Sequence, residues 1–185
     1  MKGLIMDNDI QRVLYSEAKI QETCKRLGSQ LTNVYRSKRP LVVCVLKGAV
    51  PFTADLIKRM DVYMDLDFID VSSYHGGTKS SGTVKLLKDL DTSVAGRDVL
   101  FVDDIVDTGK TLVYLQRLLR NRGAASMKVC TLMDKPEARP NDGVKADYVG
   151  FQVPNEFLVG YGLDYQGKYR NLPYVGILKP DIYQA

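Results

Sequence analysis

Residues 99–111 read Val-Leu-Phe-Val-Asp-Asp-Ile-Val-Asp-Thr-Gly-Lys-Thr, and this stretch decides the fold. Residues 99–102 form an unbroken apolar run, which predicts a strand buried on both faces of a parallel sheet. Two adjacent carboxylates, Asp103 and Asp104, end that run, and a short polar turn follows them. After the turn, helical spacing relates four leucines, namely Leu112, Leu115, Leu118 and Leu119. The order strand, loop, helix indicates an α/β fold.

The turn between this strand and helix has the composition of a phosphate-binding loop. Ligands of open α/β sheets bind at the carboxyl ends of strands, and the free N–H groups at a helix N-terminus attract an anion. Glycine lets the backbone approach a phosphate closely, and threonine hydroxyls add donors. We therefore predict a phosphate site formed by Asp107, Thr108, Gly109, Lys110 and Thr111. The two carboxylates before the turn could hold a sugar diol or Mg²⁺-bound water.

Two other phosphate motifs do not fit the sequence. A Walker A loop needs a glycine where Asp104 stands, and the dinucleotide fingerprint that starts at Gly160-Tyr161-Gly162 has Tyr165 at its third glycine position. An ordinary strand–helix unit with an acidic loop is the other interpretation of residues 99–111. Three carboxylates within five residues, before a Gly-containing turn, favour the functional interpretation.

Two lysines also follow predicted strands. Lys47 and Gly48 come after the apolar run 41–46, and Lys135 comes after the run 127–133. At a strand's carboxyl end, each lysine could bind an anion or could be an ordinary solvated charge. Spacing alone leaves the first case evenly balanced and favours a surface charge for Lys135.

The remaining apolar patterns place further elements on both sides of the central stretch. They predict a helix over 16–36, a short helix ending near residue 60, strands at 62–71, 84–90, 148–153 and 174–178, and a helix end at 121–123. Residues 72–82 form a long loop rich in Gly and Ser between two strands. A loop of this kind is a mobile lid or a floppy hairpin.

Composition limits the class of protein. The chain has 185 residues, 45% hydrophobic and 26% charged, which suits one α/β domain. Neither a membrane span nor a signal peptide is expected from its short apolar runs. Three widely spaced cysteines argue against a disulfide framework and favour a reducing cytoplasm. The net charge of +4 fits anionic substrates and also weak nucleic-acid binding.

Residues 102–111 resemble the phosphoribosyl-pyrophosphate-binding motif of type I phosphoribosyltransferases, and the likeness extends from about Asp9 to Pro180. The family usually has Glu then Asp where this chain has Asp103 and Asp104, so the first side chain is one methylene shorter. The resemblance implies a central, mainly parallel sheet flanked by helices, with a small base-binding hood and a flexible hairpin loop. It also implies one domain over 1–185, with a core at about 9–150 and a hood formed by 151–185 and the N-terminal segment.

The resemblance implies a role for each site residue. The ribose 5-phosphate would bind Asp103, Asp104 and the 107–111 turn, with Asp107 as general base. Pyrophosphate would bind Lys47, Gly48 and Arg170, after a cis peptide bond at Leu46–Lys47. The purine would contact Lys135, Phe157 and Leu158, and Ser73 and Tyr74 would close over the reaction as the flexible loop. Mg²⁺ would be held by Asp103, Asp104 and Asp164.

The implied activity is transfer of a 5-phosphoribosyl group from phosphoribosyl pyrophosphate to hypoxanthine or guanine, which gives IMP or GMP and pyrophosphate. The implied protein is a cytoplasmic homodimer or homotetramer that binds neither membrane nor nucleic acid. Enzymes of the same fold that use xanthine, adenine, uracil or orotate are the nearest alternatives. An RNA-binding regulator of this fold would need a basic face, and here Lys and Arg are scattered. A simple nucleotide-binding module would leave the lid without a purpose.

Overall fold

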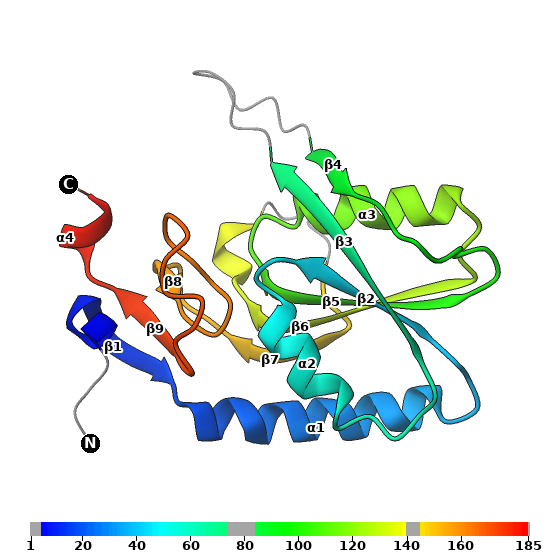
Figure 1. Ribbon diagram of the computed structural model, residues 1–185, viewed down its shortest axis with the longest axis horizontal. Coiled ribbons are helices and arrows are strands. Elements are labelled where there is room, and N and C mark those ends of the chain that lie inside the picture. Colours follow the sequence, from blue (N-terminus) through cyan, green and yellow to red (C-terminus); the bar gives the residue numbers. More distant parts are fainter. Residues whose placement is uncertain (1–4, 74–83, 140–144, 185) are drawn as a thin grey trace.

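The structure, a computed structural model, describes residues 5–73, 84–139 and 145–184. Two sheets and four α-helices make up the fold (Figure 1). In chain order the elements are the 3₁₀ turn η1 (Ile5–Asp9), β1 (Ile10–Tyr15), α1 (Glu17–Tyr35), β2 (Leu41–Leu46), α2 (Val50–Ile57), β3 (Asp65–Ser73), β4 (Val84–Lys88), β5 (Asp98–Val106), α3 (Lys110–Asn121), β6 (Ser126–Asp134), the 3₁₀ turn η2 (Pro136–Ala138), β7 (Tyr148–Gln152), β8 (Leu158–Val159), β9 (Val175–Leu178) and α4 (Pro180–Tyr183).

The larger sheet has the strand order β4-β3-β2-β5-β6-β7. All neighbouring strands run parallel except β4, which pairs antiparallel with β3. Both faces of β5 are covered: Leu100 packs with residues of α1 and α2, whereas Phe101 packs with Leu112 and Leu115 of α3. The apolar run 99–102 is therefore buried on both sides, and the predicted mainly parallel sheet flanked by helices is confirmed.

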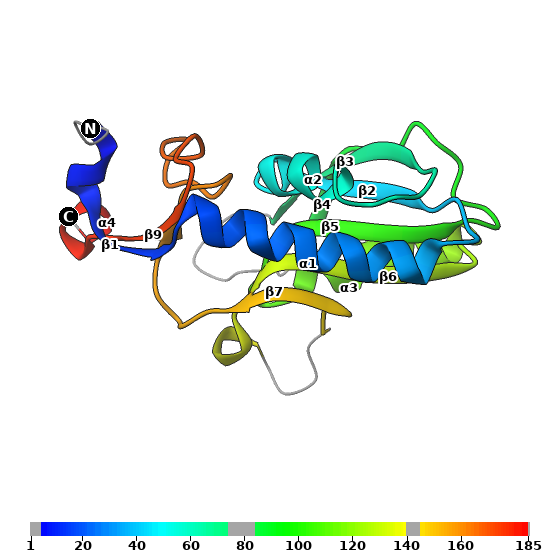
Figure 2. The ribbon, with the colours of Figure 1, turned by 90° about the horizontal axis from the view of Figure 1, so that it is seen from below.

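The smaller sheet has the antiparallel order β1-β9-β8. We call this sheet, together with the segments that flank and join β8 and β9, the hood. It joins the two ends of the chain, since Ile10 pairs with Leu178. Figures 1 and 2 show the hood and α4 at one side of the molecule, with the larger sheet at the other. Helix α1 begins directly after β1 and runs from the hood along the core. In the described ranges, none of the helices is both long and apolar enough to cross a bilayer.

Several predicted boundaries are correct and one error matters for the site. The helix predicted over 16–36 is α1, and its N-cap Ser16 accepts a hydrogen bond from the Lys19 N–H. The strand predicted to end at residue 102 continues to Val106, because Asp103 and Val106 still pair with β6. The strand predicted from residue 62 begins at Asp65, where pairing with Leu41 starts. The extension of β5 to Val106 is the difference that matters for the site, because it places Asp103 and Asp104 within the strand.

Candidate active site

The carboxyl ends of β2, β5 and β6 lie side by side, because these three strands are neighbours in the parallel part of the sheet. Lys47 and Gly48 follow β2, the 107–109 turn follows β5, and Lys135 follows β6. Three of the turns that were predicted separately from the sequence are thus brought to one edge. The hood lies beyond this edge (Figure 1).

The 107–109 turn leads directly into α3. Its last residue, Gly109, is the N-cap of the helix, with φ at 76°, and it is buried, whereas Asp107 and Thr108 are exposed. The first turn of α3 contains no acidic residue, and its N-cap makes no side-chain hydrogen bond. No acidic side chain of the first turn and no N-cap side chain therefore compensates the positive end of the helix dipole, which suits a phosphate ligand.

Asp103 and Asp104 form a carboxyl pair on β5. Only 6% of Asp103 is exposed, and its Oδ1 accepts the Asp104 N–H at 3.0 Å. Asp104 Oδ1 accepts the Ile105 N–H at 2.8 Å. Burial and the charge of Asp104 raise the pKa of Asp103 well above its usual range, and burial also raises the pKa of Asp104. A pair of carboxyls in this setting favours a cation or a donor such as a sugar hydroxyl beside it.

The turn after β2 touches both this pair and the hood. The Leu46–Lys47 peptide bond is cis, as the family resemblance implied. A Cβ on Gly48 would overlap the Asp104 carboxylate, and a Cβ on Gly162 would overlap the Gly48 carbonyl oxygen. Gly162, Gly48 and Asp104 are therefore in direct contact, and only glycine allows the two close approaches. The Lys47 side chain is exposed beside them.

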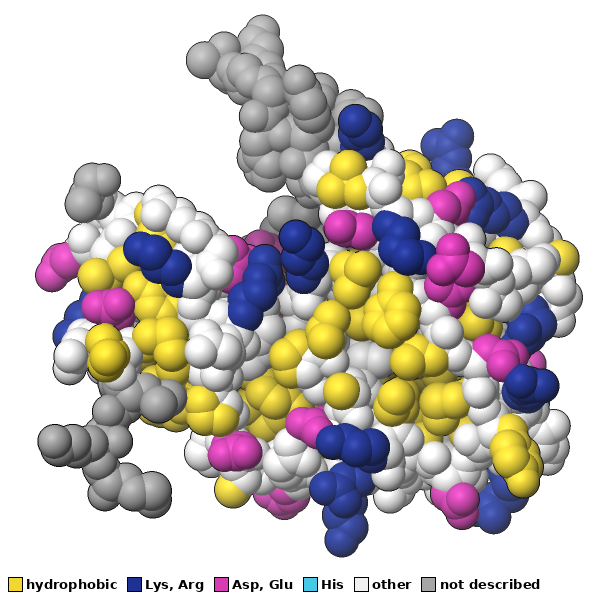
Figure 3. Space-filling view, in the orientation of Figure 1, with side chains coloured by type: hydrophobic (Ala, Val, Ile, Leu, Met, Phe, Trp, Pro, Cys, Tyr) yellow, Lys and Arg dark blue, Asp and Glu magenta, His cyan; other side chains and the backbone are white. Residues whose placement is uncertain are grey.

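Arg170 and Asp164 form an ion pair at this junction. Arg170 Nη2 lies 2.6 Å from Asp164 Oδ1, and Arg170 Nη1 donates to the Gly162 carbonyl oxygen at 2.6 Å. Asp164 Oδ2 accepts the Gly167 N–H at 2.8 Å. The positive charge of Arg170 also acts to lower the pKa of Asp104. Figure 3 shows Lys and Arg side chains gathered where the hood meets the core.

Lys135 reaches the hood next to the predicted purine-stacking residue. Its Nζ donates to the Glu156 carbonyl oxygen at 3.1 Å, directly before Phe157. The Phe157 ring stacks on Tyr183 with centroids 4.8 Å apart and meets the edge of Tyr165 at 5.4 Å. The sequence interpretation missed both tyrosines, because their contact with Phe157 depends on the hood's folding.

The other predicted site residues are placed less completely. The Leu158 side chain is buried in the core, so it can offer a ligand only its backbone. Ser73 is the last residue of β3 and pairs with Val84, which confirms the hairpin arm, whereas Tyr74 lies outside the described residues. Within the described ranges, no three His, Cys, Asp or Glu side chains gather in the way that a metal cage requires.

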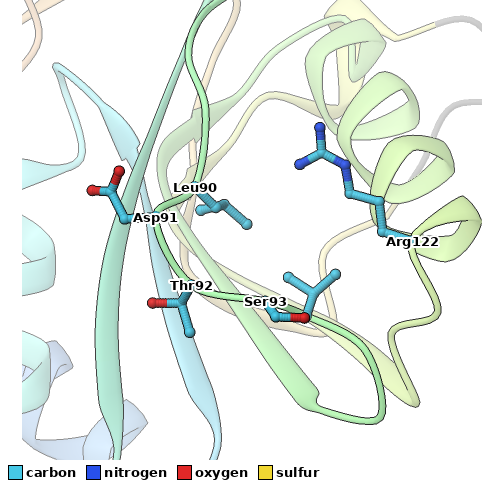
Figure 4. A pocket seen from close by; sticks show the side chains of 6 residues that line it. Leu90, Asp91, Thr92, Ser93 and Arg122 are labelled. Atoms are coloured by element: carbon cyan, nitrogen blue, oxygen red, sulfur yellow. The ribbon is translucent and has the colours of Figure 1, made fainter.

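Two surface pockets in the described ranges lie away from these residues. One, of about 290 Å³, is lined by residues 90–94 and Arg122. Figure 4 shows the Arg122 side chain directed from the end of α3 toward the loop that carries Leu90. The other, of about 580 Å³, is lined by residues 36–39, Tyr63 and Met64. Both lie at the amino ends of the strands and contain none of the predicted site residues.

Comparison with known proteins agrees with this geometry. The phosphoribosyl transferase domain family matches residues 13–166. The hypoxanthine-guanine phosphoribosyltransferase of Bacillus subtilis is 57% identical over 181 residues, which is 98% of this chain and all of that protein. The bifunctional protein TilS/HprT of Listeria innocua is 61% identical over 178 residues. That match includes 96% of this chain but only 27% of the Listeria protein.

The fold is also similar to a solved structure. A crystal structure of a hypoxanthine phosphoribosyltransferase from Staphylococcus aureus superposes with a TM-score of 0.94 at 50% sequence identity. The match covers 99% of each chain, so it includes the hood as well as the larger sheet.

Proposed function

This chain belongs to the phosphoribosyltransferase family, among the hypoxanthine-guanine phosphoribosyltransferases, and from that premise we propose that it serves purine salvage. It transfers the 5-phosphoribosyl group of phosphoribosyl pyrophosphate to hypoxanthine, and to guanine as well. The products are IMP or GMP and pyrophosphate. The candidate active site between the hood and the carboxyl ends of β2, β5 and β6 is where the reaction takes place.

The observation that carries this proposal is the position of Lys135. Its ammonium group donates to the carbonyl oxygen of Glu156, the residue before Phe157, so the donor lies on the hood segment that carries the aromatic ring. A flat purine gains from stacking on an aromatic ring, and an oxo group at its edge accepts from a lysine. Adenine has an amino donor at that edge in place of the oxo group, so the same lysine disfavours it.

The chain offers separate groups for the two ends of phosphoribosyl pyrophosphate. The backbone N–H groups at the start of α3, with Thr108 and Thr111, anchor the 5′-phosphate. Lys47, the Gly48 backbone and Arg170 bind the leaving pyrophosphate and stabilise the charge that it gains as the bond to the ribose breaks. Lys110 is exposed at the first position of α3 and adds positive charge to the phosphate site.

Asp107 is proposed as the general base. The purine loses a ring-nitrogen proton as it attacks the ribose, and a carboxylate in the exposed turn after β5 is open to accept it. Ser73 and Tyr74 are proposed to close over the reaction and to exclude water, which otherwise competes for a reactive sugar cation.

The carboxylates fit Mg²⁺ as a cofactor. Mg²⁺ at phosphate-handling sites is held by one or two carboxylates together with substrate phosphate oxygens, and no all-protein cage is needed. Asp103 and Asp104 form one such position, and Asp164, which already accepts from Arg170 and Gly167, forms the other. When bound, the ion neutralises negative charge on the pyrophosphate group.

We also propose the compartment, the domain organisation and the oligomeric state of the enzyme. All three cysteines are free and buried, which supports a reducing compartment, the cytoplasm. We propose a single domain, with a core at about 9–150 and a hood formed by 151–185 and the N-terminal segment. A homodimer or homotetramer is expected, and light scattering on the purified chain measures its mass.

A spectrophotometric assay with phosphoribosyl pyrophosphate and Mg²⁺ tests the function directly. Hypoxanthine, guanine, xanthine, adenine and uracil are supplied in parallel. Turnover of hypoxanthine and guanine without adenine or uracil is the expected result. Turnover of uracil alone would assign the chain to pyrimidine metabolism, and an RNA shift assay at several salt concentrations would then test the RNA-regulator alternative.

A further inference from the structure

Tyr161 has an unusual place in the hood. It lies between Gly160 and Gly162, and all three residues have positive φ, at 95°, 48° and 104°. A bulky residue rarely adopts such a backbone, and it does so where the surroundings hold it. The Tyr161 side chain is only 6% exposed, and it extends away from the hood into the core cluster that contains α1 and α2.

The Tyr161 hydroxyl is bound to α2. It donates to Asp55 Oδ2 at 2.6 Å, and the Pro51 carbonyl oxygen lies at 3.5 Å. Asp55 is itself fixed, since Gln21 of α1 donates to the same oxygen at 2.6 Å and Lys58 lies 2.7 Å from Oδ1. The Tyr161–Asp55 hydrogen bond therefore joins the hood to two helices of the core.

The same hood segment contacts the predicted pyrophosphate site. Gly162, the next residue after Tyr161, lies against the Gly48 carbonyl oxygen and accepts a hydrogen bond from Arg170. Gly48 lies two residues before α2, the helix that carries Asp55. The hydrogen bond thus closes a ring of contacts from Asp55 through α2 to Gly48, then to Gly162 and Tyr161.

We infer that Tyr161 is a positioning residue for the pyrophosphate end of the substrate, acting through its hydrogen bond to Asp55. The bond sets the distance between the two groups that would bind pyrophosphate, Lys47 on the turn after β2 and Arg170 in the hood. The inference rests on the proposed function. The purine site at Lys135 and the phosphate turn at 107–111 lie outside this ring of contacts and depend on it less.

Tyr161→Phe is the decisive variant, because it removes only the hydroxyl. Tyr35→Phe is its matched control: Tyr35 is also buried, in the same core cluster, and its hydroxyl has no hydrogen-bond partner among the described residues. The reverse reaction is measured with IMP, pyrophosphate and Mg²⁺. We expect the KM for pyrophosphate to rise about tenfold in Tyr161→Phe, while the KM for IMP stays within twofold. Tyr35→Phe should change neither constant.

Two substitutions of Asp55 test the route of the effect. Asp55→Ala removes the acceptor and should match Tyr161→Phe, whereas Asp55→Asn keeps an acceptor oxygen and should restore most of the affinity. The double variant Tyr161→Phe/Asp55→Ala should be no worse than the worse single variant in its KM for pyrophosphate, because each change already removes the Tyr161–Asp55 hydrogen bond. Additive losses would show that the two residues act separately, and would overturn the inference.

A binding measurement separates this inference from the proposed function. Calorimetric titration of the protein with pyrophosphate, in the presence of Mg²⁺, needs no turnover. It should show a tenfold loss of pyrophosphate affinity in Tyr161→Phe. A wild-type chain that binds pyrophosphate without transferring phosphoribosyl groups would refute the function and leave the positioning role to be decided by this titration. A lower melting temperature with unchanged pyrophosphate affinity would mean that Tyr161 is merely structural, and no binding by the wild-type chain would overturn both.

Discussion

Gly162→Ala places a methyl group at the contact between the hood and the turn after β2. A Cβ built on Gly162 would stand 1.9 Å from the Gly48 carbonyl oxygen, whereas ordinary contact begins at 3.4 Å. The hood segment and the turn would have to separate by about 1.5 Å. The atom that must give way is backbone, so no rotation of a side chain can relieve the overlap.

The separation acts on the groups proposed to bind pyrophosphate. Arg170 donates to the Gly162 carbonyl, so it moves with the hood, whereas Lys47 moves with the turn. A misplacement of about 1 Å can cost an enzyme about 100-fold in rate. We therefore expect kcat/KM for phosphoribosyl pyrophosphate to fall by about 100-fold, or about 2.7 kcal/mol of transition-state stabilisation.

Gly96→Ala is the control for backbone strain. Gly96 also has positive φ, at 69°, and an added Cβ there meets nothing within 4 Å. A non-glycine residue in such a conformation costs about 1–3 kcal/mol, so both variants should lose stability. Steady-state kinetics and thermal melts on both proteins separate strain from misplacement. The reasoning would be refuted if kcat/KM of Gly162→Ala for phosphoribosyl pyrophosphate stayed within threefold of the wild-type value, or if it fell no further than that of Gly96→Ala.

Three further predictions concern single side chains. Asp107→Asn should lower kcat about 100-fold in the hypoxanthine assay without changing the melting temperature, since the side chain is exposed; near-normal turnover would exclude it as the base. Lys135→Gln should lower kcat/KM for hypoxanthine about 10- to 100-fold, and an unchanged preference for hypoxanthine over adenine would contradict its role. Asp67→Ala should destabilise the fold by about 1–3 kcal/mol in urea denaturation, because buried Asp67 accepts the N–H groups of Phe68 and Thr92. Burial alone would raise the pKa of Asp67, but these hydrogen bonds lower it on balance, so its stabilisation is present above about pH 4 and is lost as the pH falls through the lowered pKa. A destabilisation that grew larger as the pH fell below 4 would contradict this assignment.

Local sequence information was sufficient for the larger sheet. Each buried strand is an apolar run long enough to be recognised, and Gly123, with φ at 82°, follows the end of α3 where the sequence predicted a helix end. The parallel order then brings the turns after β2, β5 and β6 to one edge without any further information. The sequence placed Lys47, Lys135 and the 107–111 turn each after a strand, but only the family resemblance assigned the two lysines to the same site as the turn.

The hood could not be predicted in the same way. Its strands β1 and β8 gain their conformation from pairing with β9, and β8 is only two residues long. No local sequence pattern indicates that β1 pairs with a strand near the other end of the chain. The structure agrees with the rejection of Gly160-Tyr161-Gly162 as a dinucleotide fingerprint, but no local pattern indicated that its two glycines allow the backbone that directs the tyrosine toward α2.

The placement of Asp103 and Asp104 inside β5 explains why a shorter side chain is compatible with the site. A carboxylate in a loop can move toward its ligand. Asp103 is held in place instead, because its backbone pairs with Thr131 of β6 and only 6% of the residue is exposed. Adding a methylene to a packed site costs about 1–3 kcal/mol, so a glutamate here would need surroundings with more room. The raised pKa of the Asp103 carboxyl also means that an ionised side chain opposes folding in the absence of a ligand. A cation or sugar hydroxyl bound beside the carboxyl pair, as we propose, would offset this cost at the carboxyl end of the central strand.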